Sequence, residues 1–437
     1  MRGKSYLHIP FLKSIAFTAA CAPALLHAGY TGIVLYSLAT PPSEPKFAWN
    51  GAPQNAAAGE FISSAYSDSG PSDNHAVLFT PTSTGAIDLN PPGFNFTIGY
   101  GTDGTYQVGT GNGPATGGMD HALVWSGSAA SAIDIDTGSV SGTIAYAISG
   151  TQVVGNGNIN HALLWPTIGN SAIDLNPSGY QSSTAWGTDG SQQVGYAAVH
   201  YSPNAMLWSG SADSAVNLNP PGYSSSYANG VSHGQQVGYG FPGNAYYQQA
   251  LLWNNTADSV VYLNPTDYLI SEAFGTNGTQ QVGQGFSSTF GQYHALLWSG
   301  TADSAVDLGT LIDSSASTFA FTIDAAGNVY GMEELNGNYF AVEWTPVPPK
   351  LGDTNLDGVI NSADLTALNT GQANHLTGWS HGDFNQDGVI NGDDWALFDL
   401  GVALSASNAS ATPEPSAAEL LAILWLATLD RKRRLAS

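Results

Sequence analysis

The sequence His161-Ala-Leu-Leu-Trp165 returns unchanged as His294-Ala-Leu-Leu-Trp298. Five variants of this element lie elsewhere in the chain: His75–Phe79, His121–Trp125, Asn204–Trp208, Gln249–Trp253 and Phe340–Trp344. The alanines that the copies share are Ala76, Ala122, Ala162, Ala205, Ala250, Ala295 and Ala341, spaced by 46, 40, 43, 45, 45 and 46 residues. Self-similarity at such a period indicates a repeat architecture, so we infer seven copies of one structural unit.

Turn and short-strand signals surround this element in each copy. Gly101–Gly109 and Gly275–Gly283 contain an Asp-Gly or Asn-Gly pair, which favours a hairpin because its residues tolerate positive φ. After the tryptophan comes a strand such as Ala172–Pro177 or Ala305–Leu308, and another such as Tyr227–Gly230 follows. Four short strands in a unit of about 45 residues are typical of a β-propeller blade.

We therefore predict a mainly β protein in which residues 29–346 form a seven-bladed β-propeller. The seventh copy ends at Trp344 without its last strand, while a spare strand at Ile33–Leu38 precedes the first copy. We expect that strand to complete the last blade, which would join the ends of the ring and leave no open edge. An open β-solenoid with seven rungs is the alternative, and the length of the units favours the propeller.

The repeat resembles the HAF-type extracellular repeat, with Leu, Val or Met in place of Phe in its His-Ala-Phe element. The resemblance covers roughly residues 31–346. That family carries no established catalytic activity, so the resemblance implies export rather than a particular reaction.

The charge of the chain limits its partners. The net charge is −24, and the 303 residues between Lys46 and Lys350 contain neither Lys nor Arg. Phosphate binding needs clustered cations, so this composition excludes a nucleic-acid partner. We expect the ring to be stabilised by aromatic packing and backbone hydrogen bonds rather than by ion pairs of Lys or Arg.

Repeated histidines and acids are the first candidates for chemistry. A ring of imidazoles could hold a metal, but the other copies have Asn204, Gln249 and Phe340 at this position, so we predict hydrogen bonds to a neighbouring strand or turn. The acids occur beside turns, which aspartate commonly caps, and Asn217 and Tyr262 replace them in two copies. The residues concerned are His75, His121, His161 and His294, and Asp88, Asp134, Asp174 and Asp307.

No catalytic residue is assigned. The chain lacks a His-Glu-x-x-His motif. The acidic doublet Glu333-Glu334 is expected in a solvated loop, and no single blade carries an evident acid pair for glycoside hydrolysis. Six of the seven copies have a tryptophan that recurs with the fold period, which predicts packing between blades. Tyr246-Tyr247 is a candidate for sugar stacking.

Residues 1–28 read as a signal peptide. Arg2, Lys4 and Lys13 give a basic start, Ile15–Leu26 is mainly apolar, and cleavage is expected after Ala28. The only cysteine, Cys21, lies within this segment, so the mature protein would have no disulfide. A lipoprotein cleavage box at Thr18–Cys21 is the alternative.

Residues 405–437 read as a linker and a sorting tail. Pro413-Glu414-Pro415 is followed by the mainly apolar stretch Ala417–Leu429 and then by Arg431–Arg434. This order resembles the PEP-CTERM sorting signal of Gram-negative bacteria, which implies recognition by an exosortase and transient membrane contact. The expected location is the cell surface or the extracellular space. A peripheral amphipathic tail is the alternative.

Two acidic loops follow a Pro-rich linker at residues 347–350. Each has oxygen-bearing side chains at positions 1, 3, 5, 9 and 12, as in an EF-hand-like loop, with Gly358 or Gly388 at position 6. The carbonyls of Val359 and Val389 would serve position 7, and the hard oxygen ligands predict two Ca²⁺ ions. Two acidic turns without metal are the alternative. The side-chain ligands would be Asp353, Asn355, Asp357, Asn361 and Asp364, and Asp383, Asn385, Asp387, Asn391 and Asp394.

A short apolar helix is expected after each loop, and a duplicated loop with its exiting helix resembles the type I dockerin over residues 351–404. The resemblance implies a small α-helical module that docks onto a cohesin. The two halves differ where that family reads its partner, Ser362-Ala363 against Gly392-Asp393. A cohesin-like protein and an extracellular polysaccharide both stay open as partners.

Two functions follow from these features. The first is an exported, non-catalytic cell-surface or matrix protein whose propeller binds a partner or glycan and is joined to a calcium-binding dockerin-like module. The second is a glycosidase or accessory protein of polysaccharide breakdown, docked through the dockerin-like module.

Overall fold

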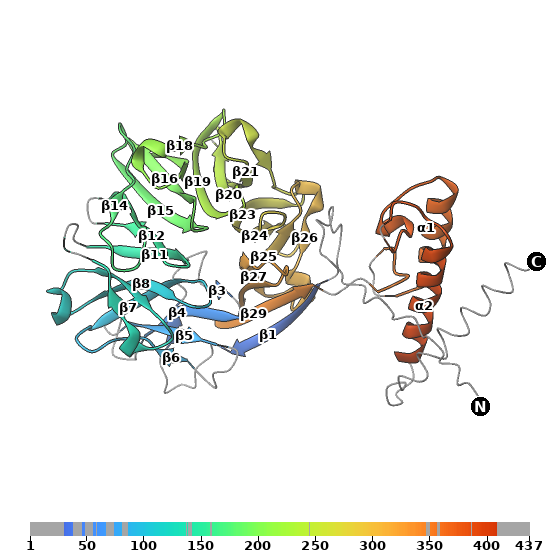
Figure 1. The fold of residues 1–437 in the computed structure, drawn as a ribbon, viewed down its shortest axis with the longest axis horizontal. Helices are drawn as coiled ribbons and strands as arrows, with labels where there is room; N and C mark the ends of the chain where they lie inside the picture. Colours follow the sequence, from blue (N-terminus) through green and yellow to red (C-terminus); the bar gives the residue numbers. More distant parts are fainter. Residues whose placement is uncertain are drawn as a thin grey trace, which may run out of the picture.

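The computed structural model describes residues 30–37, 46–48, 56–57, 59–66, 74–80, 86–136, 138, 142–157, 160–243, 245–346, 350–355, 359–385 and 387–408. Seven antiparallel sheets are arranged around a common centre, and their colours follow the chain around the ring in Figure 1. This confirms the predicted seven-bladed β-propeller.

The first three blades have the same strand order. The innermost strand comes first in the chain and the outermost strand last. In the first blade the innermost position is shared by β2 and β3. The strands are β2 (Lys46–Ala48), β3 (Ala56–Ala57), β4 (Glu60–Tyr66), β5 (Asn74–Phe79) and β6 (Ile87–Asp88); β7 (Phe96–Thr102), β8 (Gln107–Asn112), β9 (His121–Trp125) and β10 (Ile133–Asp134); and β11 (Ile144–Ser149), β12 (Gln152–Asn156), β13 (Ala162–Trp165) and β14 (Ile173–Asp174).

The next three blades repeat this order. In each, a short 3-10 turn separates the third strand from the outermost one, as at Ala212–Ser214 and Ala302–Ser304. The strands are β15 (Ser182–Thr188), β16 (Gln193–Val199), β17 (Ser202–Trp208) and β18 (Val216–Asn217); β19 (Tyr223–Ser232), β20 (Gln235–Pro242), β21 (Gln249–Trp253) and β22 (Val261–Tyr262); and β23 (Tyr268–Thr276), β24 (Gln281–Ser287), β25 (Gln292–Trp298) and β26 (Val306–Asp307).

The seventh blade joins the two ends of the ring. It consists of β27 (Ser317–Ile323), β28 (Val329–Leu335), β29 (Asn338–Pro346) and β1 (Tyr30–Ser37). Strand β1 pairs antiparallel with β29, from Tyr30 opposite Pro346 to Ser37 opposite Phe340, and the two lie side by side in Figure 1. The expected closure is confirmed, and because β3 also contacts β27 and β28, the open solenoid is wrong.

Apolar clusters lie between blades rather than within them. Trp253 packs with Leu218 of the preceding blade, and Trp298 packs in the same way with Leu263. Trp344, in the last blade, donates through Nε1 to the carbonyl of Leu308 at 2.9 Å. The repeated tryptophans are all less than 2% exposed, which confirms the predicted packing between blades.

A repeated hydrogen-bond relay also links consecutive blades. The buried amide of Ala205 donates to the Ser226 hydroxyl of the next blade at 3.0 Å, and that hydroxyl donates to Asn219 Oδ1 at 2.7 Å. Asn219 Nδ2 in turn donates to the carbonyl of Tyr223 at 3.1 Å. The alanine amide makes the same contact in five other copies, at 2.8–2.9 Å: Ala76 to Thr97, Ala122 to Thr143, Ala162 to Ser183, Ala250 to Ser271 and Ala295 to Thr318.

Six innermost strands contain a β-bulge at the same place. One residue in each has no partner opposite it, and a bulge of this kind re-aims the side chain concerned. A glycine of the second strand lies beside the bulge, where there is no room for a side chain. A Cβ on Gly195 would collide with the carbonyl oxygen of Thr184, and a Cβ on Gly283 would collide with that of Glu272. The bulged residues are Tyr100, Tyr146, Trp186, Asn229, Phe274 and Phe321.

Beyond the ring, two helices follow the two acidic loops. Helix α1 spans Ser362–Ala373 and helix α2 spans Gly392–Asn408. The two loop–helix halves pack closely against each other. A Cβ on Gly371 would collide with the carbonyl oxygen of His381, and a Cβ on Gly401 would collide with the carbonyl oxygen of Leu351. A small core joins them: Leu368, Phe384, Ile390 and Phe398. None of the described helices is long and apolar enough to cross a membrane.

Removing β1 tests the closure of the ring. Deleting residues 30–37 leaves β29 with an unpaired edge, and several backbone hydrogen bonds at about 1 kcal/mol each are lost. We expect the free energy of unfolding to fall by more than about 3 kcal/mol, measured by urea denaturation. Truncation after Asn408 serves as the control. An unchanged midpoint in the deletion variant would contradict the closure.

The relay can be tested at Ser226. Ser226→Ala leaves the buried amide of Ala205 and the side-chain oxygen of Asn219 without this partner, and we expect a loss of about 1–3 kcal/mol. The matched control is Ser224→Ala on the same strand, whose hydroxyl is exposed, with an expected change within about 0.5 kcal/mol. Equal stabilities of the two variants would refute the relay.

Candidate functional site

Asp383, at the first ligand position of the second acidic loop, is buried, and one of its carboxylate oxygens already accepts hydrogen bonds. Asp383 is 2% exposed, and its Oδ2 accepts hydrogen bonds from the amides of Gly378 and Gly388, both at 3.2 Å. Its Oδ1 is also buried and has no hydrogen-bond partner among the described residues. Gly388, at position 6, has a φ of 84°, which only glycine adopts readily. A buried carboxylate oxygen in this state is suited to a cation.

The aspartate at the last ligand position of each loop accepts hydrogen bonds from backbone amides of that loop. Asp394 Oδ1 accepts from the amide of Phe384 at 2.8 Å, and Oδ2 accepts from Asn391 at 3.0 Å. In the first loop, Asp364 Oδ1 accepts from Thr354 at 2.8 Å. Burial raises the pKa of Asp364, but hydrogen bonds from Asn361, Thr354 and Asn355 outweigh it and lower the pKa below its ordinary value. The carboxylate is therefore kept ionised.

Positions 9 and 12 also begin the helices. Asn361 Oδ1 accepts from the amide of Ala363 at 2.8 Å, and Asn391 Oδ1 accepts from that of Asp393 at 2.8 Å. Together with the aspartates at position 12, these residues form capping boxes. The four residues thus have a structural role that needs no metal.

The remaining ligand positions of the second loop bond to one another. Asn385 Nδ2 donates to Asp387 Oδ2 at 3.0 Å, and Asn391 Nδ2 donates to the carbonyl of Val389 at 3.3 Å. Among the residues that the structure describes, no three acidic, histidine or cysteine side chains are grouped closely enough to hold a metal ion. The assignment of Asp383, Asp387 and Asp394 as ligands of one ion stays a prediction.

The donor set nevertheless fits calcium. Every side-chain donor is an oxygen. Asp383 Oδ2 already accepts two amides, but the lone pairs of Asp383 Oδ1 are not used by any described residue. Hard oxygen donors suit Ca²⁺, whereas soft metals prefer sulfur or imidazole. In the first loop Asp353 is 2% exposed, as its counterpart is, and Val359 has an exposed side chain. Asp357 and Gly358 lie outside the described residues.

The repeated histidines and repeated acids are partners. In each pair the histidine Nδ1 lies 2.7–2.9 Å from an aspartate Oδ2 on the adjacent outermost strand, thirteen residues later. The aspartate's other oxygen often caps the following turn, as Asp174 Oδ1 does for the amide of Asn176 at 2.8 Å. The expected structural roles are confirmed. The pairs are His75 with Asp88, His121 with Asp134, His161 with Asp174, and His294 with Asp307.

Where the histidine is replaced, its partner is replaced as well. Asn204 stands with Asn217, and Gln249 stands with Tyr262. In the second case Gln249 Oε1 accepts a hydrogen bond from Tyr223 at 3.1 Å, and Tyr223 stacks on Tyr262 at 5.9 Å. The whole pair is exchanged for another neutral contact between strands, which favours a structural role.

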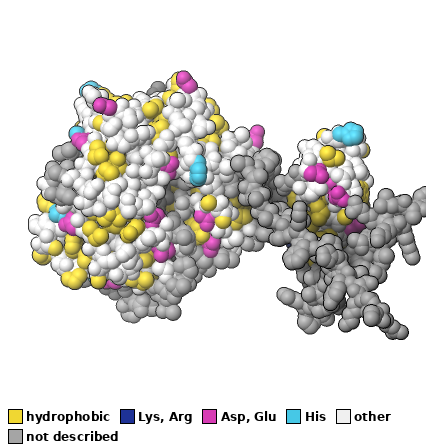
Figure 2. All heavy atoms as spheres, viewed as in Figure 1, with side chains coloured by type: hydrophobic (Ala, Val, Ile, Leu, Met, Phe, Trp, Pro, Cys, Tyr) yellow, Lys and Arg dark blue, Asp and Glu magenta, His cyan; other side chains and the backbone are white. Residues whose placement is uncertain are grey.

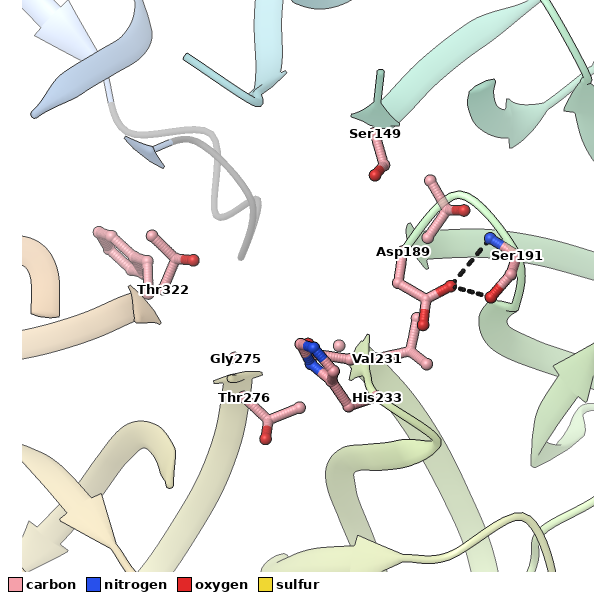
Figure 3. Close-up of a pocket in the computed structure, with 12 residues that line it drawn as sticks. Ser149, Asp189, Ser191, Val231, His233, Gly275, Thr276 and Thr322 are labelled. Atoms are coloured by element: carbon pink, nitrogen blue, oxygen red, sulfur yellow. Dashed lines mark hydrogen bonds between the residues drawn. The ribbon is translucent and has the colours of Figure 1, made fainter. Parts of the chain in front are cut away.

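A cavity of about 500 Å³ lies at the centre of the ring, lined by residues from the inner ends of five blades (Figure 3). Its side chains mainly hold the turns. Asp189 Oδ1 accepts from the amide and hydroxyl of Ser191 at 2.9 and 2.8 Å, and His233 Nδ1 lies 2.8 Å from Ser232 Oγ. The Thr276 hydroxyl donates to the carbonyl of Gln280 at 2.9 Å.

The acidic doublet lies within a strand, not in a loop. Glu333 belongs to β28, which pairs on both sides, and it is only 4% exposed. The expectation of a solvated loop is therefore wrong for this residue. Burial raises the pKa of Glu333, and the nearby charge of Asp313 raises it further.

One acid that the sequence analysis did not single out has a more unusual setting. Glu272 lies on the innermost strand β23, and its two carboxylate oxygens accept hydrogen bonds from Gln248 at 2.6 Å and Gln284 at 3.0 Å. Burial raises the pKa of Glu272, although the two amides act in the opposite direction. The sequence signal that could have found Glu272 is its position in the repeat. The equivalent position holds no acid in the innermost strands β7, β11, β15, β19 and β27.

The terminal motifs lie outside the described residues. These are the signal segment 1–28 with Cys21, and the sorting motif Pro413, Glu414 and Pro415. The exposed pair Tyr246 and Tyr247 is described, with exposed fractions of 93% and 54%.

No protein-family model and no curated protein sequence match this chain. Solved propellers are similar to it at low identity. The β-propeller domain of the Trilobed protease from Pyrococcus furiosus is 11% identical, with a TM-score of 0.46, over 69% of this chain and 95% of that one. An oligogalacturonate lyase in complex with manganese is 9% identical, with a TM-score of 0.42, over 74% and 99% of the two chains.

The acylaminoacyl peptidase from Pyrococcus horikoshii is 12% identical, with a TM-score of 0.40 over 64% of this chain. This chain spans about half of that peptidase, 50% of its length. At these values the similarity carries no argument about activity or ligand, and the propeller assignment rests on the sheet order. The Trilobed protease propeller has an open velcro topology, whereas here β1 pairs with β29.

Proposed function

We propose that this chain is an exported, non-catalytic cell-surface or matrix protein, with a propeller that binds a partner or glycan and two loops that bind calcium. The observation that carries the calcium part is the buried Oδ1 of Asp383, which has no hydrogen-bond partner among the described residues and lies in a loop of matching spacing. Taking an ionised carboxylate oxygen out of water is costly unless a cation compensates for it.

In this proposal, Ca²⁺ would be held by the side chains at positions 1, 3, 5, 9 and 12 and by the carbonyls of Val359 and Val389. The ion would supply positive charge at the centre of each loop. The core of the helix pair is small, so metal binding would contribute a large part of its stability. The dockerin resemblance supports a cohesin-like partner, and the C-terminal motif supports an exosortase.

The role of the repeated titratable groups supports a non-catalytic ring. The His–Asp pairs recur with the fold and are exchanged for neutral pairs in other copies. A catalytic site needs a constellation that only one place in the molecule provides.

Polysaccharide breakdown is the alternative, and one observation favours it. Burial raises the pKa of both Glu272 and Glu333, and a raised carboxyl pKa is typical of a general acid. Incubating the mature protein with plant and algal polysaccharides decides between the two functions. We expect no reducing sugar above a heat-treated control, and robust release would refute the non-catalytic proposal.

Calcium binding is tested by calorimetry on the chelator-treated mature protein. We expect two ions per chain, and one ion after Asp383→Asn. At calcium a hundredfold above Kd, the helix pair should gain about 2.7 kcal/mol of stability for each site. The control is Asp399→Asn, which changes an exposed residue of α2; this variant should still bind two ions. Absence of heat and an unchanged circular dichroism spectrum would refute calcium binding.

A further inference from the structure

Aromatic side chains project from one face of the ring. The loops between the second and third strands of three consecutive blades carry Tyr201, Tyr246, Tyr247 and Phe290, with exposed fractions of 101%, 93%, 54% and 45%. Because the three blades have the same strand order, these loops lie on the same face. Rings exposed to this degree contribute little to the stability of the ring, and a patch of them marks an interaction surface.

The loop of Tyr246 and Tyr247 is tied to Glu272. Gln248 follows Tyr247 directly, and its carbonyl accepts a hydrogen bond from the amide of Ser271 at 3.2 Å while its side chain donates to Glu272. The exposed tyrosines and the carboxylate are therefore neighbours across two blades. Glu272 lies three positions before Gly275, the first residue of β23 that lines the cavity, so the two Cα atoms are about 10 Å apart along the strand.

Glu272 has acceptor capacity left for a ligand. A carboxylate offers about four lone pairs, and the amides of Gln248 and Gln284 occupy one on each oxygen. Gln284 must direct its NH₂ group to the carboxylate, so its Oε1 points elsewhere. This oxygen is buried and has no hydrogen-bond partner in the part of the chain that the structure describes. The side chain of Gln284 is 8% exposed. An unmet acceptor thus lies beside a carboxylate that can accept more hydrogen bonds.

Two phenol groups lie near this carboxylate. Burial raises the pKa of both Tyr239 and Tyr293, and the carboxylate of Glu272 raises each further, which shows that both phenols lie within electrostatic reach of it. Tyr239 stacks on Tyr227 at 4.9 Å, and Tyr293 packs edge-on against Phe286 at 5.3 Å.

The charge of the ring restricts the ligand. There is no Lys or Arg between Lys46 and Lys350, so an anionic polymer would meet no compensating cation. The side of the molecule drawn in Figure 2 is mostly white, the colour of uncharged polar side chains and backbone, with scattered yellow hydrophobic and magenta acidic side chains. Flat aromatic rings beside hydrogen-bond acceptors suit a neutral chain with many hydroxyl groups, whose sugar rings stack while its hydroxyls donate.

We infer that the loop of Tyr246 and Tyr247, together with Glu272 and Gln284, forms a binding site for a neutral polysaccharide. This inference rests on the proposed glycan-binding role of the ring and assigns that role to one place. The exposed rings stack on the sugars, and the carboxylate accepts their hydroxyl groups.

The test is native affinity electrophoresis of the mature protein in gels containing xyloglucan, glucomannan or dextran, with polygalacturonate and chitosan as charged probes. We expect retardation by at least one neutral polymer. Tyr246→Ala/Tyr247→Ala and Glu272→Gln should each weaken its apparent affinity about tenfold or more, as loss of an anchoring contact does. Tyr262→Ala, a tyrosine of similar exposure (49%) on an outermost strand, is the matched control and should bind as the wild type.

Melting temperatures verify that each variant is folded. Because Tyr246 and Tyr247 are both exposed, we expect the double tyrosine variant to fold, and it keeps the test valid if Glu272→Gln unfolds. Retardation of the wild type with unchanged affinity in the folded variants would overturn this site but leave glycan binding by the ring intact. Retardation by only polygalacturonate or only chitosan would overturn the neutral ligand. Failure of every probe to retard the wild type would refute glycan binding by the ring as well.

Discussion

The hydrogen bond from a buried alanine amide to a hydroxyl of the next blade is the contact on which the ring depends. It occurs six times with nearly constant length, and in five copies the hydroxyl passes the bond on to an Asn or Asp in the connecting turn. The alanine must be small because it is fully buried between sheets. One contact therefore explains why Ala76 and its equivalents recur, and why a Ser or Thr lies near the start of the innermost strand of the following blade.

The relay also shows how the ring does without lysine and arginine. The ion pairs seen within the blades join a histidine to an aspartate. Buried glutamines contribute as well, since Gln193 Nε2 donates to Gln152 of the preceding blade at 2.9 Å and Gln281 Nε2 donates to Gln235 at 2.8 Å. Neutral hydrogen bonds are weakly screened by salt, in contrast to exposed ion pairs.

Much of the fold could be predicted from the sequence, because the repeat period and the turn pairs are local signals. The closing strand could also be predicted, from a missing strand in the last copy. The pairing of His161 with Asp174 was missed, since each residue was assessed as a separate series although both recur at a fixed offset. The burial of Glu333 was missed because no loop signal or strand pattern distinguishes an acid in a central strand from one at an edge.

The candidate site residues could likewise be predicted only in part from the sequence. Spacing alone indicated the two acidic loops and the helices after them, and the structure places Asp383 and Asp364 in buried positions there. The capping role of Asn361 and Asn391 could have been read from the residues three positions later. Glu272 belongs to no sequence motif, and its setting depends on Gln248 of a loop and Gln284 of β24, neither of which carries a signal of its own.

The pairing of β1 with β29 sets an order of events during synthesis. Tyr30 and Pro346 face each other across the closing strands but are separated by almost the whole propeller in sequence. The first strand made must therefore wait, with an unpaired edge, until the last blade has emerged. Contacts so distant in sequence form slowly because loop-closure entropy is lost before they are made. The ring closes only once its chain is complete, so a partly synthesised or partly translocated propeller stays open.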